Sequence, residues 1–414
     1  MSHMVGERTY VAVDLFCGCG GISAGLRDSG VRVIAGADIE PNYICTFRHN
    51  FPEAQAVTDD LSKLDPSKFM QRLGLKEGQL DILAGGPPCQ GFSKNVPRKH
   101  RFLDDSNNLL VLTFIKYVEA LQPKFVLMEN VAEMKNGFER SYTQEIVSRL
   151  QEDGYRVSYQ VLNAADYGVP QRRRRAFFIA WKAPLSLNFP TPTHIRPTNG
   201  PSEFSLLPWL EWQHVTVWEA IGDLPSIPHD DGRKTYEYRC EPFSEYQRNI
   251  RRGCEMVMNH TPRALAPTQY ERLVSLKPGQ GYKDLPAHLR PRSGYSGAYG
   301  RLTKDMVAPT ITRWVFHPGS GRFGHPEDAR VITIREAARL QGFPDDFEFT
   351  GTYTQQAGQV GNAVPPLLIQ KIAEAMLRQG GYTDGNGFSE AASKLMNASS
   401  VSRPDSEGNR NAIR

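Results

Sequence analysis

The sequence predicts an α/β protein with a mostly parallel sheet, an antiparallel hairpin at the sheet edge and a smaller second domain. Short apolar runs alternate with segments of helical period from residue 10 to residue 128, as in a parallel sheet covered by helices. Two β-rich runs then flank a charged turn, which predicts the hairpin. Regular periodicity stops after residue 182 and returns near residue 325, so we expect an inserted domain between these points.

Each parallel strand is predicted from a short apolar run that precedes a turn or a helical segment. A helical stretch near residues 142–150 leads into the two hairpin strands, at residues 155–162 and 176–181. The predicted parallel strands occupy residues 10–16, 31–37, 81–84 and 125–128.

The chain is expected to divide where its composition changes. Residues 8–182 form the first domain, and residues 183–324, rich in Pro, Arg and aromatic residues without periodicity, form the second. Residues 325–380 return to the first domain, because Thr333 and Glu336 have capping-box spacing and an apolar helical pattern follows. Few large apolar residues remain in residues 381–414, so we expect a disordered tail.

Composition limits the class of protein. A hydrophobic content of 40% and a charged content of 23% predict a soluble globular enzyme, and the net charge of +4 does not by itself indicate a polyanionic partner. The 6 cysteines show no CxxC spacing, so we expect a reducing, cytoplasmic compartment and no metal site. No apolar run approaches the length of a membrane span, and no export leader is recognisable.

A glycine-rich turn after the first strand predicts a cofactor site. The segment Cys-Gly-Cys-Gly-Gly at residues 17–21 includes Gly18 and Gly20 and lets a ligand approach the backbone closely. Asp38 ends the next strand, 20 residues after Gly18, where its carboxylate can accept hydrogen bonds from ribose hydroxyls. This pairing indicates a cofactor that contains adenosine, and a tight turn without a ligand is the alternative.

Three further residues are candidates for the adenine ring of such a cofactor. Asp60 follows the third strand region and can accept from the adenine amino group, while Phe16 and Ile39 can cover the two ring faces. Position 23 is Ser, so the full Gly-x-Gly-x-x-Gly pattern of nicotinamide-binding enzymes is absent. An oxidoreductase is therefore less favoured than a methyltransferase.

A cysteine and a glutamate follow the later parallel strands. Cys89 lies in the segment Gly-Gly-Pro-Pro-Cys-Gln-Gly-Phe-Ser, residues 85–93, where Pro-Pro stiffens the turn that presents the thiol. Glu129 ends an apolar strand, so its carboxyl can have a raised pKa and donate a proton. An inert buried cysteine and a solvated glutamate are the alternatives. Because neighbouring parallel strands end at one sheet edge, we expect the two side chains to act together.

A thiolate and a proton donor together suit substitution at carbon 5 of a pyrimidine. Thiolate addition at carbon 6, with proton donation at ring nitrogen 3, makes carbon 5 nucleophilic enough to attack a sulfonium methyl group. Loss of the carbon 5 proton then expels the thiolate and restores the aromatic base. This chemistry requires neither a metal nor a redox cofactor.

Four consecutive arginines follow Gln171 at the start of the second hairpin strand. Alternate side chains of an extended chain face the same side, so Arg173 and Arg175 can enter the site while Arg172 and Arg174 face solvent or phosphate. A solvated charged turn is the alternative.

Taken together, these segments resemble the cytosine-5 DNA methyltransferase family of the bacterial restriction–modification type. The resemblance spans residues 10 to about 378. It implies a Rossmann-like S-adenosylmethionine-dependent methyltransferase domain and a smaller target-recognition domain at residues 183–324. The matching segments, in family order, are residues 14–21, 86–93, 129–131, 167–175, 308–312, 335–344 and 359–366.

The resemblance also implies roles for individual residues. Cys89 would be the nucleophile and Glu129 would contact cytosine at ring nitrogen 3. Arg173 would support the base and the acid, with Arg175 in the same cluster. S-adenosyl-L-methionine, converted to S-adenosyl-L-homocysteine, would be the cofactor, and no metal is implied. Some members carry an aromatic residue where this chain has Ile39. The implied cofactor contacts are Phe16, Gly18, Gly20, Asp38, Ile39, Asp60, Pro88, Leu110, Asn362 and Val364.

Double-stranded DNA is the expected partner. A thiol reaches a cytosine only after the base has rotated out of the helix, so the loop after Cys89 should close over the DNA. That loop offers Gln90, Ser93, Lys94, Arg98, Lys99, His100 and Arg101, and a solvated basic loop is the alternative. The second domain offers further candidate phosphate or base contacts at Arg248, Arg251, Arg252, Arg290 and Arg292.

Three rival functions remain at the level of sequence. One is the same chemistry on transfer RNA, another is a catalytically inactive DNA-binding module on this fold, and the third is an oxidoreductase that uses the glycine turn. The length of the second domain favours DNA, and the presence of Cys89, Glu129 and Arg173 favours an active enzyme. We expect a monomer of prokaryotic or phage origin, near the nucleoid. A cognate restriction endonuclease that acts separately is a candidate partner, and the sequence does not show whether one exists. The recognised DNA sequence does not follow from these residues.

Overall fold

The computed structural model describes residues 9–88, 109–132, 140–182, 186–195, 212–292 and 297–380. Its centre is a seven-stranded sheet of order β3-β2-β1-β4-β5-β7-β6. All neighbouring strands from β3 to β5 are parallel, whereas β7 is antiparallel to both β5 and β6. The predicted α/β fold with an edge hairpin is therefore confirmed. The strands are β1 Val11–Leu15, β2 Arg32–Asp38, β3 Gln55–Thr58, β4 Ile82–Gly85, β5 Phe125–Val131, β6 Tyr155–Asn163 and β7 Arg174–Lys182.

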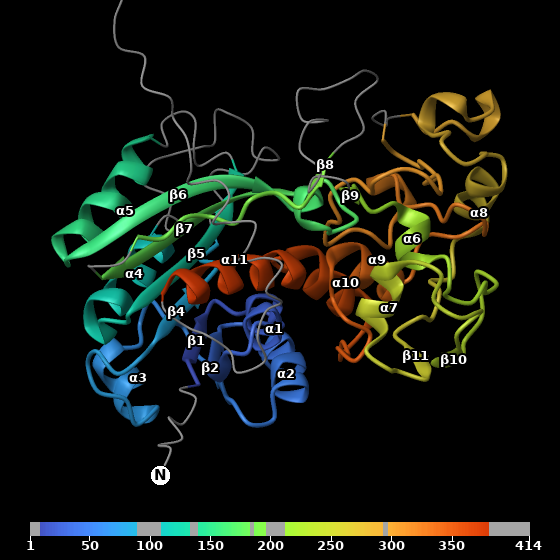
Figure 1. The fold of residues 1–414 in the computed structure, drawn as a ribbon. Helices are drawn as coiled ribbons and strands as arrows, with labels where there is room; N and C mark the ends of the chain where they lie inside the picture. Colours follow the sequence, from blue (N-terminus) through green and yellow to red (C-terminus); the bar gives the residue numbers. More distant parts are fainter. Residues whose placement is uncertain are drawn as a thin grey trace, which may run out of the picture.

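Helices cover both faces of this sheet because successive strand residues point to opposite sides. Ala12 and Leu127 pack on the face with α1, α2 and α11, whereas Val13 and Val126 pack on the face with α3, α4 and α5. In Figure 1, α11 runs across the front of the sheet. These helices are α1 Gly21–Asp28, α2 Pro41–Asn50, α3 Pro66–Arg72, α4 Leu109–Leu121, α5 Arg140–Glu152 and α11 Pro366–Gln379.

The contact between α1 and α11 depends on a glycine. A Cβ atom on Gly25 would lie 2.5 Å from Cβ of Ile369, and it would also meet the carbonyl oxygen of Pro366. Such distances are far below normal van der Waals contact, so the two helix backbones approach closely only because residue 25 lacks a side chain. This packing brings a segment from the end of the chain against the first helix after β1.

We predict that Gly25→Ala lowers the free energy of unfolding by about 1–3 kcal/mol, because α1 and α11 must move apart. Alanine by itself favours a helix over glycine, so a loss of stability would come from the packing clash. Urea denaturation measures the effect. Gly232→Ala is the matched control, because a Cβ at Gly232 meets no atom within 4 Å. A Gly25→Ala protein as stable as the control would contradict the close-packing account.

A second lobe lies beside the sheet, on the right of Figure 1. It is built from short elements and loops, in agreement with the absence of steady periodicity in this part of the sequence. Its α-helices are α6 Val217–Ile221, α7 Glu245–Arg251 and α8 Pro267–Val274, and its short strand pairs are β8 His194–Ile195 with β9 Trp212–Gln213 and β10 Thr235–Glu237 with β11 Met256–Met258. Three short 3-10 helices follow among the described residues of this part of the chain, η7 Tyr282–Asp284, η8 Ala287–Leu289 and η9 Pro318–Ser320. Another, η5 Ala164–Tyr167, lies between β6 and β7.

Two helices connect this lobe to the sheet domain. Helix α9, Ile334–Gln341, begins at the predicted capping box, in which Thr333 Oγ1 accepts from the Glu336 amide at 3.2 Å and Glu336 Oε2 accepts from the Thr333 amide at 2.7 Å. It contacts α6 of the lobe and also α10, Tyr353–Asn362. The domain boundaries at residues 182 and 324 stay a prediction.

Buried ion pairs fix α9 in place. The fully buried Arg339 pairs with Asp345 at 2.6 Å and with Asp223 after α6. Arg330 pairs with both carboxylate oxygens of Glu336 at 2.8 Å. Bidentate pairs of this kind hold both partners in a single orientation.

Within the described residues, no helix is long and apolar enough to cross a membrane.

Candidate active site

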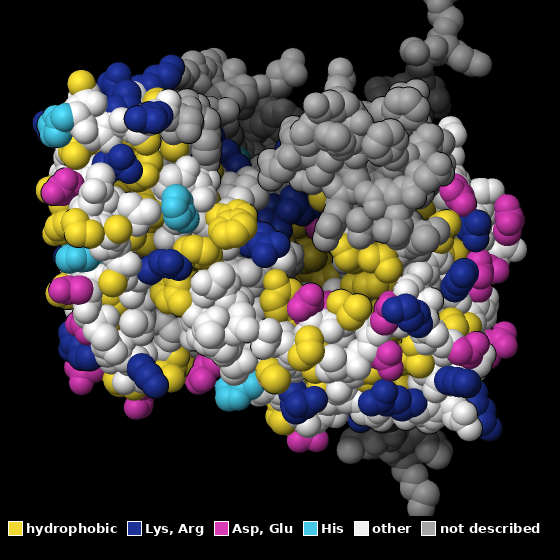
Figure 2. All heavy atoms as spheres, turned by 180° about the vertical axis from the view of Figure 1, so that it is seen from behind, with side chains coloured by type: hydrophobic (Ala, Val, Ile, Leu, Met, Phe, Trp, Pro, Cys, Tyr) yellow, Lys and Arg dark blue, Asp and Glu magenta, His cyan; other side chains and the backbone are white. Residues whose placement is uncertain are grey.

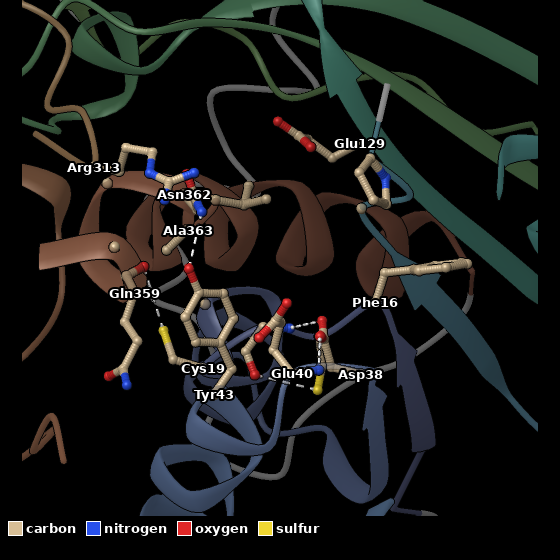
Figure 3. A pocket seen from close by; sticks show the side chains of 18 of the residues that line it. Phe16, Cys19, Asp38, Glu40, Tyr43, Glu129, Arg313, Gln359, Asn362 and Ala363 are labelled. Atoms are coloured by element: carbon tan, nitrogen blue, oxygen red, sulfur yellow. Dashed lines mark hydrogen bonds between the residues drawn. The ribbon is translucent and has the colours of Figure 1, made fainter. Parts of the chain in front are cut away.

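A pocket of about 930 Å³ opens at the carboxyl ends of β1, β2, β4 and β5. Loops that follow these strands supply one part of its wall, and residues 310–314 with the segment from α10 to α11 supply the other. Figure 3 shows Glu129 and Arg313 on the upper side of the pocket, and Tyr43, Glu40 and Asp38 on the lower side. Ten of the predicted site residues line it, namely Phe16, Gly18, Asp38, Ile39, Pro88, Glu129, Arg173, Arg175, Asn362 and Val364.

The glycine turn is held in place by the predicted acid. Gly18 has a φ of 56°, and its amide donates to Asp38 Oδ2 at 2.9 Å. The second oxygen, Oδ1, accepts from the Glu40 amide at 2.9 Å. Each carboxylate oxygen keeps a second lone pair, so the side chain can still accept hydrogen bonds from a ligand. Burial raises the pKa of Asp38, and the two amide hydrogen bonds oppose this rise.

Three predicted cofactor residues lie outside the pocket lining. Gly20 faces the hydrophobic core, where a Cβ would lie 2.6 Å from the Phe51 ring. The Asp60 carboxylate accepts from Ser62 Oγ at 2.6 Å and pairs with Lys63 at 2.9 Å. Leu110 is half-buried in the first turn of α4. The structure thus engages Gly20 and Asp60 in local contacts, and the cofactor role of these three residues stays a prediction.

Glu129 is the buried acid of the pocket, with 9% of its surface exposed. It lies on β5, where the antiparallel register with β7 places Val131 opposite Arg175. The Arg175 Nε atom lies 2.9 Å from Glu129 Oε1. Burial raises the pKa of Glu129, while the positive charges of Arg175 and then Arg173 oppose this rise. The carboxyl therefore holds a proton more readily than a solvated glutamate does, beside a guanidinium that fixes its orientation.

Arg173 has a different set of partners. Its guanidinium donates to the carbonyl oxygens of Ile311 at 3.0 Å, Gly361 at 3.1 Å and Ala363 at 3.0 Å. It is 2% exposed, and burial lowers its pKa. These contacts join residue 311 to the connection between α10 and α11. The resemblance implied that Arg173 supports the acid, but in the structure the ion pair to Glu129 is made by Arg175.

The predicted alternation along the arginine run is confirmed. Arg173 and Arg175 line the pocket, whereas Arg172 and Arg174 are exposed. The extended backbone that leads into β7 produces this pattern. Two cations are therefore directed to the site and two to the surface beside it.

Asn130 positions the turn that precedes the predicted nucleophile. Its side-chain amide donates to the Pro87 carbonyl oxygen at 3.1 Å, and Asn130 itself is 2% exposed. The next residue, Pro88, lines the pocket and is followed in the chain by Cys89. The structural description does not extend to Cys89, nor to the loop residues Gln90, Ser93, Lys94, Arg98, Lys99, His100 and Arg101.

Sequence reasoning missed several residues of the pocket. Tyr43 on α2 accepts a hydrogen bond from the Asn362 amide at 3.0 Å and thus links α2 to α10. Glu40, Arg313 and Gln359 also line the pocket. Glu40 and Tyr43 follow Asp38 closely in the sequence. This closeness to a predicted pocket residue was the one signal that could have identified them. The approach of Arg313 depends on a long-range contact that the sequence does not display.

The candidate DNA contacts in the second lobe fall into two groups. Arg251 pairs with Asp223, with 2.7 Å between Arg251 Nε and Asp223 Oδ2, and Arg252 pairs with Asp28 at the end of α1. These ion pairs engage both guanidiniums within the protein, and a role of either residue in DNA binding stays a prediction. Arg248 and Arg292 are exposed. Arg290 is exposed as well, although it donates to the Leu285 carbonyl oxygen at 3.0 Å.

No group of three or more His, Cys, Asp or Glu side chains suited to a metal ion occurs in the part of the chain that the structure describes. The site is built from the buried acid Glu129, the buried Arg173, the half-buried Arg175, a glycine turn and a proline turn. This set can bind a ligand with a ribose and can hold a proton close to a planar base.

Comparison with known proteins identifies the family that carries this arrangement. The model of the C-5 cytosine-specific DNA methylases matches residues 10–378. The chain belongs to this family. It is therefore a DNA (cytosine-5-)-methyltransferase.

Relatives and solved structures agree with this assignment. The Type II methyltransferase M1.HphI of Haemophilus parahaemolyticus is 35% identical over 89% of this chain and 87% of its own length. The Type II methyltransferase M.AgeI of Thalassovita gelatinovora is 31% identical over 88% of this chain and 98% of its own. A structure described as an E. coli prophage-encoded DNA modification methyltransferase has a TM-score of 0.71 and 27% identity, over 90% of this chain and 100% of its own. Spodoptera frugiperda DNMT2, at 17% identity, a TM-score of 0.57 and coverage of 89% and 100%, shares the fold.

Proposed function

We propose that this methyltransferase transfers a methyl group from S-adenosylmethionine to carbon 5 of a flipped-out cytosine in a specific double-stranded DNA sequence. The reaction would proceed through a covalent bond between Cys89 and carbon 6 of the cytosine. The observation that carries the proposal is the buried Glu129–Arg175 pair in the same pocket as the Gly18 turn and Pro88. A cofactor and a base bound there would lie beside this acid, and Cys89 directly follows Pro88 in the chain.

The pocket residues fit S-adenosylmethionine. The backbone of Gly18 adopts a positive φ and lines the pocket, so a ligand can approach it closely. Asp38 keeps free lone pairs for ribose hydroxyls, and Phe16 offers an aromatic face to the adenine ring. A volume of about 930 Å³ leaves room for a base beside the cofactor. When bound, the cofactor supplies an electrophilic methyl group on a sulfonium.

The protein would contribute four functions to the reaction. The Cys89 thiolate would add to carbon 6, and the Glu129 carboxyl would hold a proton at ring nitrogen 3. Arg175 would keep that carboxyl oriented through the ion pair at 2.9 Å. Arg173 would act as a positioning residue, because its carbonyl contacts hold the opposite wall of the pocket.

The biological setting follows from the relatives. M1.HphI and M.AgeI are named Type II methyltransferases, so we propose that this enzyme also acts in a restriction–modification system. A separate endonuclease would then cut the same sequence when it is unmethylated. We also propose that residues 183–324 recognise the target and that the enzyme works as a monomer in a prokaryotic or phage-infected cytoplasm.

We predict that Asp38→Asn weakens the binding of S-adenosylhomocysteine by about 10-fold, because a charged acceptor for the ribose hydroxyls is lost. Isothermal titration calorimetry measures this without any turnover. Glu53→Gln, which removes an exposed carboxylate outside the pocket, is the matched control. Equal affinity in the Asp38→Asn protein and the control would remove Asp38 from the cofactor site.

Transfer of a tritiated methyl group to duplex DNA and to transfer RNA tests the proposal. We expect label in DNA alone, as 5-methylcytosine at a defined sequence. Label only in transfer RNA would replace the proposed substrate. Absence of label in both, together with DNA binding, would favour the inactive DNA-binding module.

A further inference from the structure

One exposed aromatic side chain at the pocket has no role in the chemistry above. Trp314 is 50% exposed and lines the pocket. Among the other large apolar side chains exposed in the described residues, only Ile39 also lines it, and Ile39 belongs to the proposed cofactor end. Contact between a tryptophan ring and water is unfavourable because most of the ring is apolar. A half-exposed tryptophan at the mouth of a site therefore indicates a surface that a ligand covers.

The turn that carries Trp314 is fixed from both sides. Thr310 Oγ1 donates to the Arg172 carbonyl oxygen at 2.7 Å, and the Ile311 amide donates to Gln171 Oε1 at 2.7 Å. Further along, the His317 amide donates to the Trp314 carbonyl oxygen at 2.9 Å. The indole is thus presented on a preorganised turn, which reduces the entropy lost when it binds a partner.

Aromatic rings and cations lie next to one another here: Arg313 and Trp314 are exposed, Arg263 is half-buried, and Phe316 is buried. Arg313 Cζ lies 5.2 Å from the centroid of the Trp314 ring, and that ring lies 5.8 Å from the Phe316 ring. Arg263 Cζ lies 4.4 Å from the centroid of the Phe316 ring. We call these four residues the Trp314 ledge, namely Arg263, Arg313, Trp314 and Phe316. Such a combination of flat apolar surface and positive charge suits nucleic acid, whose bases stack and whose phosphates are anionic.

The ledge lies on the base side of the pocket. Figure 3 shows Arg313 on the same side as Glu129, away from Asp38 and Glu40. Gln171 accepts a hydrogen bond from the Ile311 amide in the turn that carries Trp314. The exposed Arg172 and Arg174 come one and three positions after Gln171 in the chain. Figure 2, which draws the molecule from behind the view of Figure 1, shows Lys or Arg side chains at one side of the hollow near its middle. The charge at this rim is therefore complementary to a phosphate backbone.

We propose that the Trp314 ledge binds duplex DNA beside the extrahelical cytosine, and this inference rests on the proposed function. Rotation of a base out of the helix removes a stacking partner from each neighbouring base. The Trp314 indole would stack against a nucleotide next to the vacated position, and Arg313 would pair with an adjacent phosphate. Trp314 thereby favours the flipped state through binding, without contact with the reacting atoms.

The test compares Trp314→Ala and Trp314→Phe with the wild type on a short unmethylated duplex that contains the sequence which the wild type methylates. We expect Trp314→Ala to weaken DNA binding and raise the KM for DNA by about 10-fold to 100-fold, the range of one lost base stack. Trp314→Phe should restore most of this affinity because it keeps an aromatic face. The Kd for S-adenosylhomocysteine should stay the same in both variants. Tyr159→Ala, which removes another half-exposed ring outside both the pocket lining and residues 183–324, is the matched control.

Several results would overturn the inference. Equal DNA affinity in Trp314→Ala and the wild type would do so, and so would a parallel loss of S-adenosylhomocysteine affinity, which would mark a structural role. An effect on transfer RNA binding alone would replace DNA with RNA as the partner of the ledge. Methyl transfer by the wild type is measured separately, so failure of the proposed function would appear there as absence of label in DNA.

Discussion

Cys89→Ala is expected to abolish methyl transfer to DNA, with a loss in kcat on the order of 10⁴-fold or more. Without the thiolate, no covalent bond forms at carbon 6 and carbon 5 stays a poor nucleophile. The substitution leaves Asp38, Phe16 and the Gly18 turn intact, so the affinity for S-adenosylhomocysteine should not change. Tritium transfer and calorimetry on the same preparation measure the two properties.

Cys45→Ala is the matched control for this variant. Cys45 is exposed on α2 and does not line the pocket. Its replacement should leave methyl transfer unchanged. An active Cys89→Ala enzyme would remove the cysteine from the mechanism, whereas a loss of both transfer and cofactor binding would indicate misfolding.

The second large effect is expected for Glu129→Gln, with a fall in kcat of about 10² to 10⁴-fold. The amide has nearly the same shape as the carboxyl, but it cannot deliver a proton to ring nitrogen 3. It also loses the charge that pairs with Arg175 at 2.9 Å. Single-turnover transfer at saturating DNA and cofactor isolates this step from binding.

The pH dependence of the wild type provides an independent check on Glu129. Burial raises the pKa of this carboxyl above its ordinary 4.5, so the protonated form persists to higher pH than in a solvated glutamate. The rate of transfer should therefore fall as the pH rises through this pKa. Glu129→Gln has no such proton to lose and should lack that limb of the profile. Retention of the limb in the variant would assign it to another group.

Much of the sheet was predictable because its signals are local. Apolar runs of strand length mark β1, β2, β4 and β5, and alternation along the arginine run placed Arg173 and Arg175 inward. The capping box of α9 was visible in the spacing of Thr333 and Glu336. Each of these features depends on residues within a few positions of one another.

The remaining features depend on contacts between distant segments. The role of Gly20 against Phe51, and the ion pairs of Arg251 and Arg252, require knowledge of which loops meet in space. A basic residue in a loop looks the same in the sequence whether it faces DNA or a carboxylate within the protein. The same reason explains why Arg313 and Trp314 were not recognised as pocket residues.

The central claim is the covalent bond between Cys89 and the target cytosine, and one measurement tests it most directly. The enzyme is incubated with S-adenosylmethionine and a duplex in which 5-fluorocytosine replaces the target base. Because carbon 5 then carries no proton to lose, elimination stops and the protein should stay bound to the DNA. Mass spectrometry of the digested complex should place the base on the peptide that contains Cys89. Formation of 5-methylcytosine from normal DNA without such an adduct, or an adduct on another residue, would contradict the account.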